Sequence, residues 1–372
     1  VPLKSLNYLS LEDTVDSDSI ISTDKDKIRV KDYSAISVMC GLKSLYLNSD
    51  IIKDIGFIKG LPALEDLTLE DTAVISLASL SEMPALRSLT LLGNNKVQDF
   101  GPVGTATGLT SLSIDKMTSQ PDPDLSSLSG LEKLDIKGFM SISSVRGLSG
   151  LKELSIHNCN VDQADALSSL TGVERLTFYS VWNSQGNLRS LDFLKGMTGL
   201  KYADFTGNLD GTGWSGYNYL VEVYGDVSSI FNHQGLEELY LDNGKFEINF
   251  DKIKENPGLR VLSLRNMELH KNYYVESYGG MTSVWYDDVK LGEHMDILSR
   301  FPNLEELYLD SNELTDLNFA AGLKNLKRLG LKDNYITDLS PLKQAEFLEY
   351  LDIRDNPVGE VGDVGNGVEI LQ

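Results

Sequence analysis

One pattern of apolar residues, Leu-x-x-Leu-x-Leu-x-x-Asn, recurs along the chain and is clearest near its C-terminal end. Units of this pattern begin at Leu304, Leu326 and Leu348, so the spacing is 22 residues each time. Fourteen units in one register cover almost the whole chain, and such self-similarity is the signature of a repeat array. Toward the N-terminus, the first apolar position recurs at Leu259, Leu236, Leu200, Val173, Leu151, Leu131, Leu109, Leu86, Leu64, Leu42 and Leu6.

Each unit contains two apolar periods. The Leu-x-Leu part has a period of two, which predicts a short strand whose alternate side chains face inward. The segment before the next unit has a period of three, as in Ile336, Leu339 and Leu342, which favours tight 3₁₀ turns over an α-helix. No unit can bury its apolar face alone, so the units must stack. We therefore predict an α/β solenoid, a leucine-rich-repeat horseshoe, with a parallel concave sheet of about fourteen short strands and mainly 3₁₀ turns on the convex side.

Four intervals between units are longer than the others. The period-three segment resumes normally before each following unit, so the additional residues come directly after a strand. We expect one leucine-rich-repeat domain over residues 1–372, with the insertions on one edge of it. These irregular insertions are predicted near residues 15–29, 182–187, 209–223 and 268–291.

The ninth position of the unit is predicted to face inward. Asparagine at Asn94, Asn312 and Asn334 fits a buried ladder of amides that bond to neighbouring turns. Several units in the middle of the array depart from this rule and carry Met117, Phe139, Cys159 or Val181 there. The middle of the stack should therefore depend more on packing than on an amide ladder.

The repeat resembles the bacterial leucine-rich repeats of the internalin type. The residues that carry the resemblance are the 22-residue spacing and the phrases Ile-Thr-Asp-Leu-Ser-Pro-Leu at 336–342 and Leu-Thr-Asp-Leu at 314–317. At the level of the repeat it covers nearly the whole chain. The resemblance implies a non-catalytic binding module on a secreted or cell-surface bacterial protein. Such repeats serve many partners, so it implies no particular one.

Composition narrows the classes of partner. The formal net charge of −22 disfavours nucleic acid, whose binding needs cationic contacts to phosphate. No apolar run approaches the roughly 20 residues that span a bilayer, so we expect no membrane insertion. An acidic stretch begins at Asp13 and continues to Asp26. It lacks the glycine and terminal glutamate of an EF-hand, which favours a solvated loop and leaves calcium binding open.

We find no motif for catalysis, a cofactor or a structural metal site. The chain has no His-Glu-x-x-His, Cys-x-x-Cys, P-loop or Gly-x-Ser-x-Gly sequence. His157 and Cys159 lie close in sequence, but the register places Cys159 inward and His157 on the concave surface. Cys40 is five repeats from Cys159, which is too far for a disulfide. We therefore expect a protein that is not an enzyme.

Aromatic residues mark the candidate contact surface. Tyrosines recur at outward strand positions, and all three tryptophans fall in the long insertions. Large aromatic side chains anchor many interfaces, although these rings could instead pack on each other. The predicted partner-binding residues are Tyr179, Trp182, Tyr202, Trp214, Tyr217, Tyr219, Tyr240, Tyr273, Tyr274, Tyr278, Trp285, Tyr286 and Tyr308.

Three functions are compatible with this surface. The leading hypothesis is a module that binds a protein partner through the concave face and the aromatic insertions. Exposed Trp and Tyr could also stack on sugar rings, so a carbohydrate-binding protein is an alternative. An intracellular structural adaptor is the third, since the two cysteines do not identify a secreted or a cytoplasmic location.

Overall fold

The structure is a computed structural model of the 372-residue chain. It describes the backbone of residues 6–12, 33–116, 119–179, 191–207, 222–278, 281–359, 361–362, 364 and 367–372. The side chains of residues 222–226, 245 and 270–286 are outside this description. The acidic stretch, the insertions near 15–29 and 182–187, and residues 209–221 of the third insertion also lie outside the described residues.

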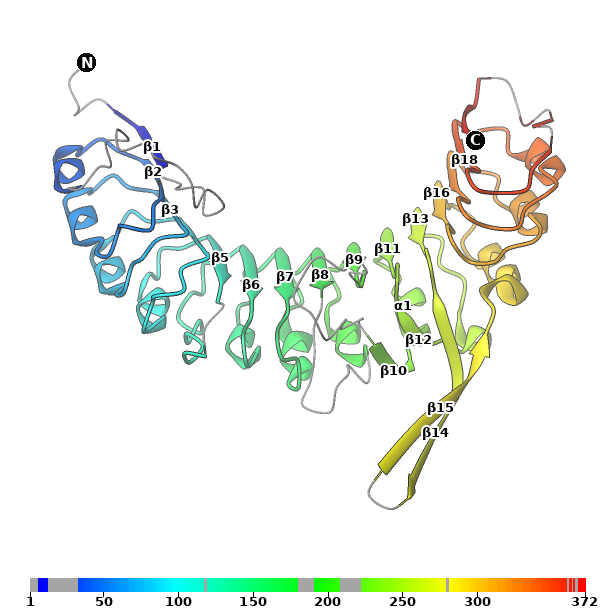
Figure 1. Cartoon of the computed structure of the whole chain (residues 1–372), viewed down its shortest axis with the longest axis horizontal. Helices are drawn as coiled ribbons and strands as arrows, with labels where there is room; N and C mark the ends of the chain where they lie inside the picture. The colour runs from blue at the N-terminus through cyan, green and yellow to red at the C-terminus, as the bar shows by residue number, and fades with distance from the viewer. Residues whose placement is uncertain are drawn as a thin grey trace, which may run out of the picture. The chain divides into compact units, whose positions relative to one another are not determined.

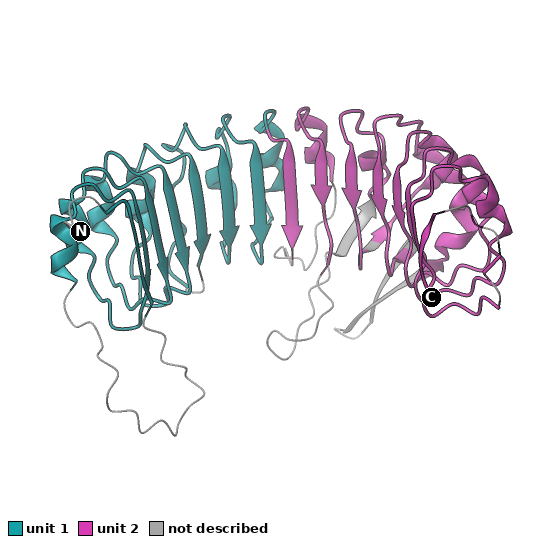
Figure 2. Ribbon diagram, turned by 90° about the horizontal axis from the view of Figure 1, so that it is seen from above, with its two compact units in different colours: residues 1–172 teal, residues 173–372 magenta. Residues whose placement is uncertain are grey.

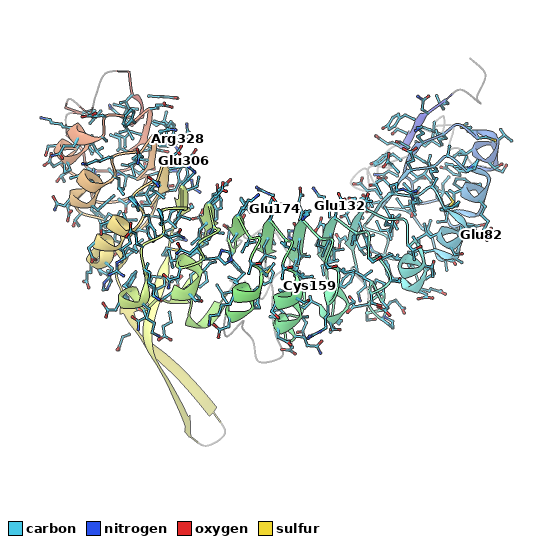
Figure 3. The ribbon with its side chains drawn as sticks, turned by 180° about the vertical axis from the view of Figure 1, so that it is seen from behind. Glu82, Glu132, Cys159, Glu174, Glu306 and Arg328 are labelled. Carbon is cyan, nitrogen blue, oxygen red and sulfur yellow. The ribbon has the colours of Figure 1, made fainter. Side chains whose placement is uncertain are left out.

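The chain divides into two compact units, residues 1–172 and residues 173–372 (Figure 2). Each unit is a stack of the repeats that the leucine pattern predicts. The hypothesis of one domain over the whole chain stays a prediction.

The first unit contains seven described strands, which are parallel and pair in sequence order (Figure 1). Their register follows the leucine pattern, because Leu45 pairs with Leu67 and Leu67 pairs with Leu89. All three leucines are at most 2% exposed. The strands are β1 (Tyr8–Glu12), β2 (Ser44–Asn48), β3 (Asp66–Glu70), β4 (Ser88–Leu92), β5 (Ser111–Asp115), β6 (Lys133–Lys137) and β7 (Glu153–His157).

The second unit continues the same pattern, and apart from its first strand its strands are shorter. These are β8 (Arg175–Tyr179), β9 (Tyr202–Asp204), β11 (Glu238–Tyr240), β13 (Val261–Ser263), β16 (Glu306–Tyr308), β17 (Arg328–Gly330), β18 (Tyr350–Asp352) and β19 (Glu369–Leu371). Over the described part of the chain the parallel sheet has fifteen strands, so the predicted leucine-rich-repeat solenoid is confirmed. The additional strand is β19, which pairs with β18 although its segment lacks the leucine pattern.

Short 3₁₀ helices connect most of the strands, as the period of three predicts. Apolar residues at every third position, such as Ile52, Ile55 and Ile58, are at most 2% exposed. One short α-helix, α1 (Ser228–Phe231), occupies the corresponding place before β11. The 3₁₀ helices are η2 (Ser34–Val38), η3 (Gly56–Gly60), η4 (Ala78–Glu82), η5 (Gly101–Thr105), η6 (Ser143–Val145), η7 (Ala164–Ser169), η8 (Asp192–Gly196), η9 (Phe250–Lys252), η10 (Leu291–Arg300), η11 (Asn318–Gly322) and η12 (Ser340–Gln344).

A second sheet is formed by residues that follow the strands of the second unit. Its order is β10 (Glu222–Asp226), β12 (Lys245–Glu247), β14 (Glu268–Tyr278) and β15 (Met281–Val289). Strands β14 and β15 form a long antiparallel hairpin (Figure 1). The expectation of an irregular insertion near 268–291 was therefore wrong for this segment. Its sequence is rich in Tyr and Val, which favour strands.

The ninth position faces inward as predicted, both where it is an asparagine and where another residue replaces the asparagine. The amide of Asn334 donates to the carbonyl oxygens of Leu309 and Leu331 at 3.0 and 2.8 Å, which satisfies buried groups of two turns. In the last repeats of the first unit, Phe139 and Cys159 are fully buried. The structure adds a buried lysine that the pattern did not predict, since Lys116 is 1% exposed and its Nζ lies 3.0 Å from the Asp122 carboxylate.

Candidate partner-binding surface

The outward side chains of β8, β9, β11, β13, β16, β17 and β18 form a surface that we call the tyrosine face. Tyr202, Tyr240 and Tyr308 lie on this face and are half-buried. The rings of Tyr202 and Tyr240 are 5.4 Å apart between centroids and tilted by 41°. The strands thus bring together three of the tyrosines that the sequence singled out, all within the second unit.

Arginine side chains lie over the tyrosine rings. The guanidinium carbon of Arg175 is 3.7 Å from the centroid of the Tyr202 ring. The corresponding distance is 4.2 Å both for Arg265 over Tyr308 and for Arg328 over a fourth ring, Tyr350. A cation over the face of an aromatic ring is attracted by the ring's negative face. These contacts hold both partners in one orientation and so reduce the entropy that binding would cost.

Tyr350 was missed by the sequence analysis. It occupies the third position of its unit, as Tyr202 does, whereas Tyr240 and Tyr308 occupy the fifth. Both positions are outward, and the alternation of a strand places them on the same side. The pairing of an arginine on the preceding strand with a tyrosine at the third position was the available signal, as in Arg175 with Tyr202 and Arg328 with Tyr350.

The phenol groups donate hydrogen bonds to carboxylates on their own strands. Tyr240 donates to Glu238 at 3.1 Å and Tyr308 to Glu306 at 2.6 Å. Burial, helped by the nearby Asp204 carboxylate, raises the pKa of Tyr202 to about 12. Burial likewise raises the pKa of Tyr240 and Tyr308 above the ordinary value of 10.0. The phenols stay protonated at neutral pH. Because each donates its one O–H to a carboxylate, the face presents aromatic rings and phenol oxygens that can accept.

An Asp-Arg-Asp cluster lies in the seventh-position column. The Arg265 guanidinium donates from Nη1 to Asp242 at 2.9 Å and from Nε to Asp310 at 2.6 Å. The Asp242 side chain is only 8% exposed, and Asp242 Oδ1 also accepts from the Ser263 hydroxyl at 2.6 Å. The cluster links three successive strands, so it fixes the centre of the tyrosine face.

The second-position column is also paired along the stack. Glu305 lies between Arg260 and Lys327, and the Lys327 Nζ atom is 2.7 Å from its carboxylate. The hydrogen bond from Lys327 is the largest influence that lowers the pKa of Glu305. The charges of neighbouring strands therefore neutralise one another here. A partner would meet little uncompensated charge along this column.

The other predicted contact residues fall into three groups. Tyr179 is half-buried on β8. Tyr273, Tyr274 and Tyr278 lie on β14, and Trp285 and Tyr286 lie on β15, with Tyr274 paired opposite Trp285; the side chains of these five lie outside the described residues. Trp182, Trp214, Tyr217 and Tyr219 also lie outside the described residues.

Comparisons with known proteins bear on the repeat. A family model for leucine rich repeats in two copies matches residues 302–344. No curated protein matches the chain. Among solved structures, the internalin inlF from Listeria monocytogenes has a TM-score of 0.66 and 20% sequence identity, over 94% of this chain and 87% of that one. The chain is a leucine-rich-repeat protein with an internalin-like fold.

Two further structures share this leucine-rich-repeat fold. One is a leucine-rich-repeat protein from Leptospira interrogans, with a TM-score of 0.56 and 16% identity over 90% of this chain and 91% of that one. The other is a Toll–Spatzle complex of Drosophila, with a TM-score of 0.62 and 16% identity over 87% of this chain and 41% of that chain. Identities this low establish the fold alone.

The described residues of this leucine-rich-repeat protein contain nothing that indicates catalysis. Cys159 is buried, and burial raises the pKa of its thiol to about 12, so it is a poor nucleophile. His157 faces outward and its Nε2 atom lies 3.3 Å from Asp135, which confirms the register assigned to the pair. In the same part of the chain no group of three His, Cys, Asp or Glu side chains could hold a metal ion. No helix there is long and apolar enough to cross a membrane.

Proposed function

We propose that this leucine-rich-repeat protein binds a protein partner through the tyrosine face. The observation that carries the proposal is the row of half-buried tyrosines held by arginines in the second unit. Tyrosine and arginine, together with tryptophan, are enriched among the interface residues that dominate binding energy. A rigid, ordered row of them loses little entropy when a partner docks.

The similar structures support a protein partner and a location outside the cell. A Toll–Spatzle complex shares the fold, and it is an assembly of two proteins. The likeness to an internalin extends the resemblance of the repeats and supports our proposal that this chain belongs to a secreted or cell-surface bacterial protein. In this proposal the aromatic insertions, including Trp214 and Trp285, add to the tyrosine face.

A photo-crosslinking amino acid tests both the partner and the face. We would replace Tyr308 by p-benzoylphenylalanine, irradiate the protein in extracts of bacteria and of host cells, and identify the captured protein. The matched control places the same probe at Tyr46, which occupies the fifth position of β2 in the first unit. Specific capture from position 308 and not from 46 is the expected result.

Affinity for the captured protein gives the quantitative test. Tyr240→Ser and Tyr308→Ser should each weaken binding by about 30-fold or more, as truncation of a dominant interface residue does. Tyr46→Ser should leave the affinity unchanged, although it also loses a phenol bonded to a carboxylate, that of Glu70 at 2.8 Å. Equal affinities for all three variants, at unchanged melting temperature, would exclude the tyrosine face as the contact surface.

A further inference from the structure

A depression of about 320 Å³ lies in the second unit where its last strands begin. We call it the strand-start pocket. Its position differs from the tyrosine face, because its lining residues precede the strands rather than project from their middle. They are Arg260, Asn303, Glu305, Asn325, Lys327 and Phe347.

The repeat register explains why a pocket forms here. Asn303, Asn325 and Phe347 each precede the first leucine of a unit and are spaced by 22 residues. In the ten units before them this position holds only glycine or alanine, so the larger side chains are confined to the last three units. The small residues are Gly41, Ala63, Ala85, Gly108, Gly130, Gly150, Gly172, Gly199, Gly235 and Gly258.

Two amides of the pocket are fixed by the backbone of the preceding turn. Asn303 donates from Nδ2 to the Pro257 carbonyl at 2.9 Å, and Asn325 donates to the Pro302 carbonyl at 3.0 Å. The Asn325 Nδ2 atom also donates to the Asn303 Oδ1 atom at 3.5 Å, so the Asn325 oxygen is the amide acceptor left for a ligand. Within the described part of the chain, the Asn325 oxygen accepts no hydrogen bond.

The charges of the pocket largely satisfy one another. Glu305 accepts from Arg260 and from Lys327, the second at 2.7 Å. An ammonium carries three donors and a guanidinium five, so both cations keep N–H groups for a ligand. The Glu349 carboxylate of the next unit also attracts the Lys327 ammonium and helps to raise its pKa. The pocket therefore offers donors and acceptors together, with little net field to select an anion.

Phe347 supplies an apolar surface beside these polar groups. Phe347 is 58% exposed, so much of its ring is open to a ligand. The negative face of an aromatic ring attracts the weakly positive C–H groups of a ligand. A ligand that matches this pocket thus has one apolar face and hydroxyl groups around its rim.

We propose that the strand-start pocket binds one pyranose ring of a glycan. A sugar hydroxyl both donates and accepts, as the paired charges and the amide oxygen require, and the C–H face of the ring packs on Phe347. The volume lies at the small end of the roughly 300–1,000 Å³ of ligand pockets, which suits a single ring. This site is independent of the tyrosine face and of the proposed protein partner.

The full chain titrated with simple sugars tests the pocket. We would add methyl glycosides of glucose, galactose, mannose and N-acetylglucosamine and follow amide shifts by NMR. At least one should perturb the amides of Asn325 and Phe347, with a Kd on the order of 1 mM. Phe347→Ala should then weaken the binding of that sugar by about tenfold. The matched control is Tyr335→Ala, which removes a ring of similar exposure, 60%, outside the pocket.

Three results would overturn the proposal. The first is that none of the four glycosides shifts these amides in the wild-type chain. The second is that both variants bind the sugar equally well. The third is that a short acidic peptide binds the pocket more tightly than every sugar, which would assign it to a peptide ligand. An unchanged melting temperature of Phe347→Ala, expected from its exposed ring, separates lost binding from lost folding.

Discussion

We expect Arg265→Leu to lower the free energy of unfolding by about 2–3 kcal/mol. The change removes two charge-assisted hydrogen bonds, to Asp242 at 2.9 Å and to Asp310 at 2.6 Å. Each such bond contributes about 1.5–3 kcal/mol when its surroundings are partly buried. The expected loss is smaller than the sum of two such bonds, because the Asp242 carboxylate still accepts hydrogen bonds from the Ser263 hydroxyl at 2.6 Å and from the backbone N–H of residue 265 at 2.9 Å.

The matched control is Arg260→Leu, the same substitution five residues earlier. Arg260 also bonds to a carboxylate, that of Glu305, but its side chain is 53% exposed and that of Glu305 is 27% exposed. Pairs in this setting contribute less than about 1 kcal/mol. Urea unfolding followed by circular dichroism gives the free energy of unfolding of both variants, provided that its slope against urea concentration is the same for each. Equal losses in the two variants would refute the stabilising role assigned to the buried cluster.

Three further perturbations test the register and the buried polar groups. Leu331→Asp should unfold or fray the last repeats, because Leu331 is 0% exposed. Lys332→Ala should lower the free energy of unfolding by less than about 1 kcal/mol, because the Lys332 side chain is 45% exposed. Equal melting temperatures of the two variants would contradict the register. At pH 8 only the exposed Cys40 should react with Ellman's reagent in the folded protein, and two reactive thiols would contradict the burial of Cys159. Because burial raises the pKa of the Cys159 thiol from 9.0 to about 12, the stability that the buried protonated thiol contributes is lost as pH rises through that window. Lys116→Met should lower the unfolding free energy by about 2 kcal/mol or more in thermal unfolding, because it leaves a largely buried carboxylate without its cation; an unchanged midpoint would contradict this.

The sequence predicted the parallel sheet because its signal is redundant. Each strand needs two or three apolar residues in a fixed register, and the same register recurs unit after unit, so one substitution does not hide it. Phe139 and Cys159 break the asparagine rule and still occupy buried positions. Strand β19 was missed because its Glu369-Ile370-Leu371 sequence carries no such pattern and depends on pairing with β18.

The site was less predictable, since it depends on contacts between units. The tyrosines could be placed on the outward face, but the arginines over their rings come from neighbouring strands and are not set by a single unit. The hairpin β14–β15 was missed because a search for the repeat treats any departure from it as a loop. The burial of Lys116 was also missed, because a lysine is normally exposed and only the pairing of Lys116 with Asp122 permits its burial.

The alternating second-position column has a consequence for how this array can change length. The column reads Glu237, Arg260, Glu305, Lys327 and Glu349 on successive units. Loss of the single unit that carries Glu305 would set Arg260 beside Lys327, and like charges on adjacent strands repel. Loss of that unit together with the next would set Arg260 beside Glu349 and restore attraction. Recombination should therefore be tolerated in pairs of repeats, so that in this region two units, about 44 residues at the regular spacing, form the unit of duplication and deletion.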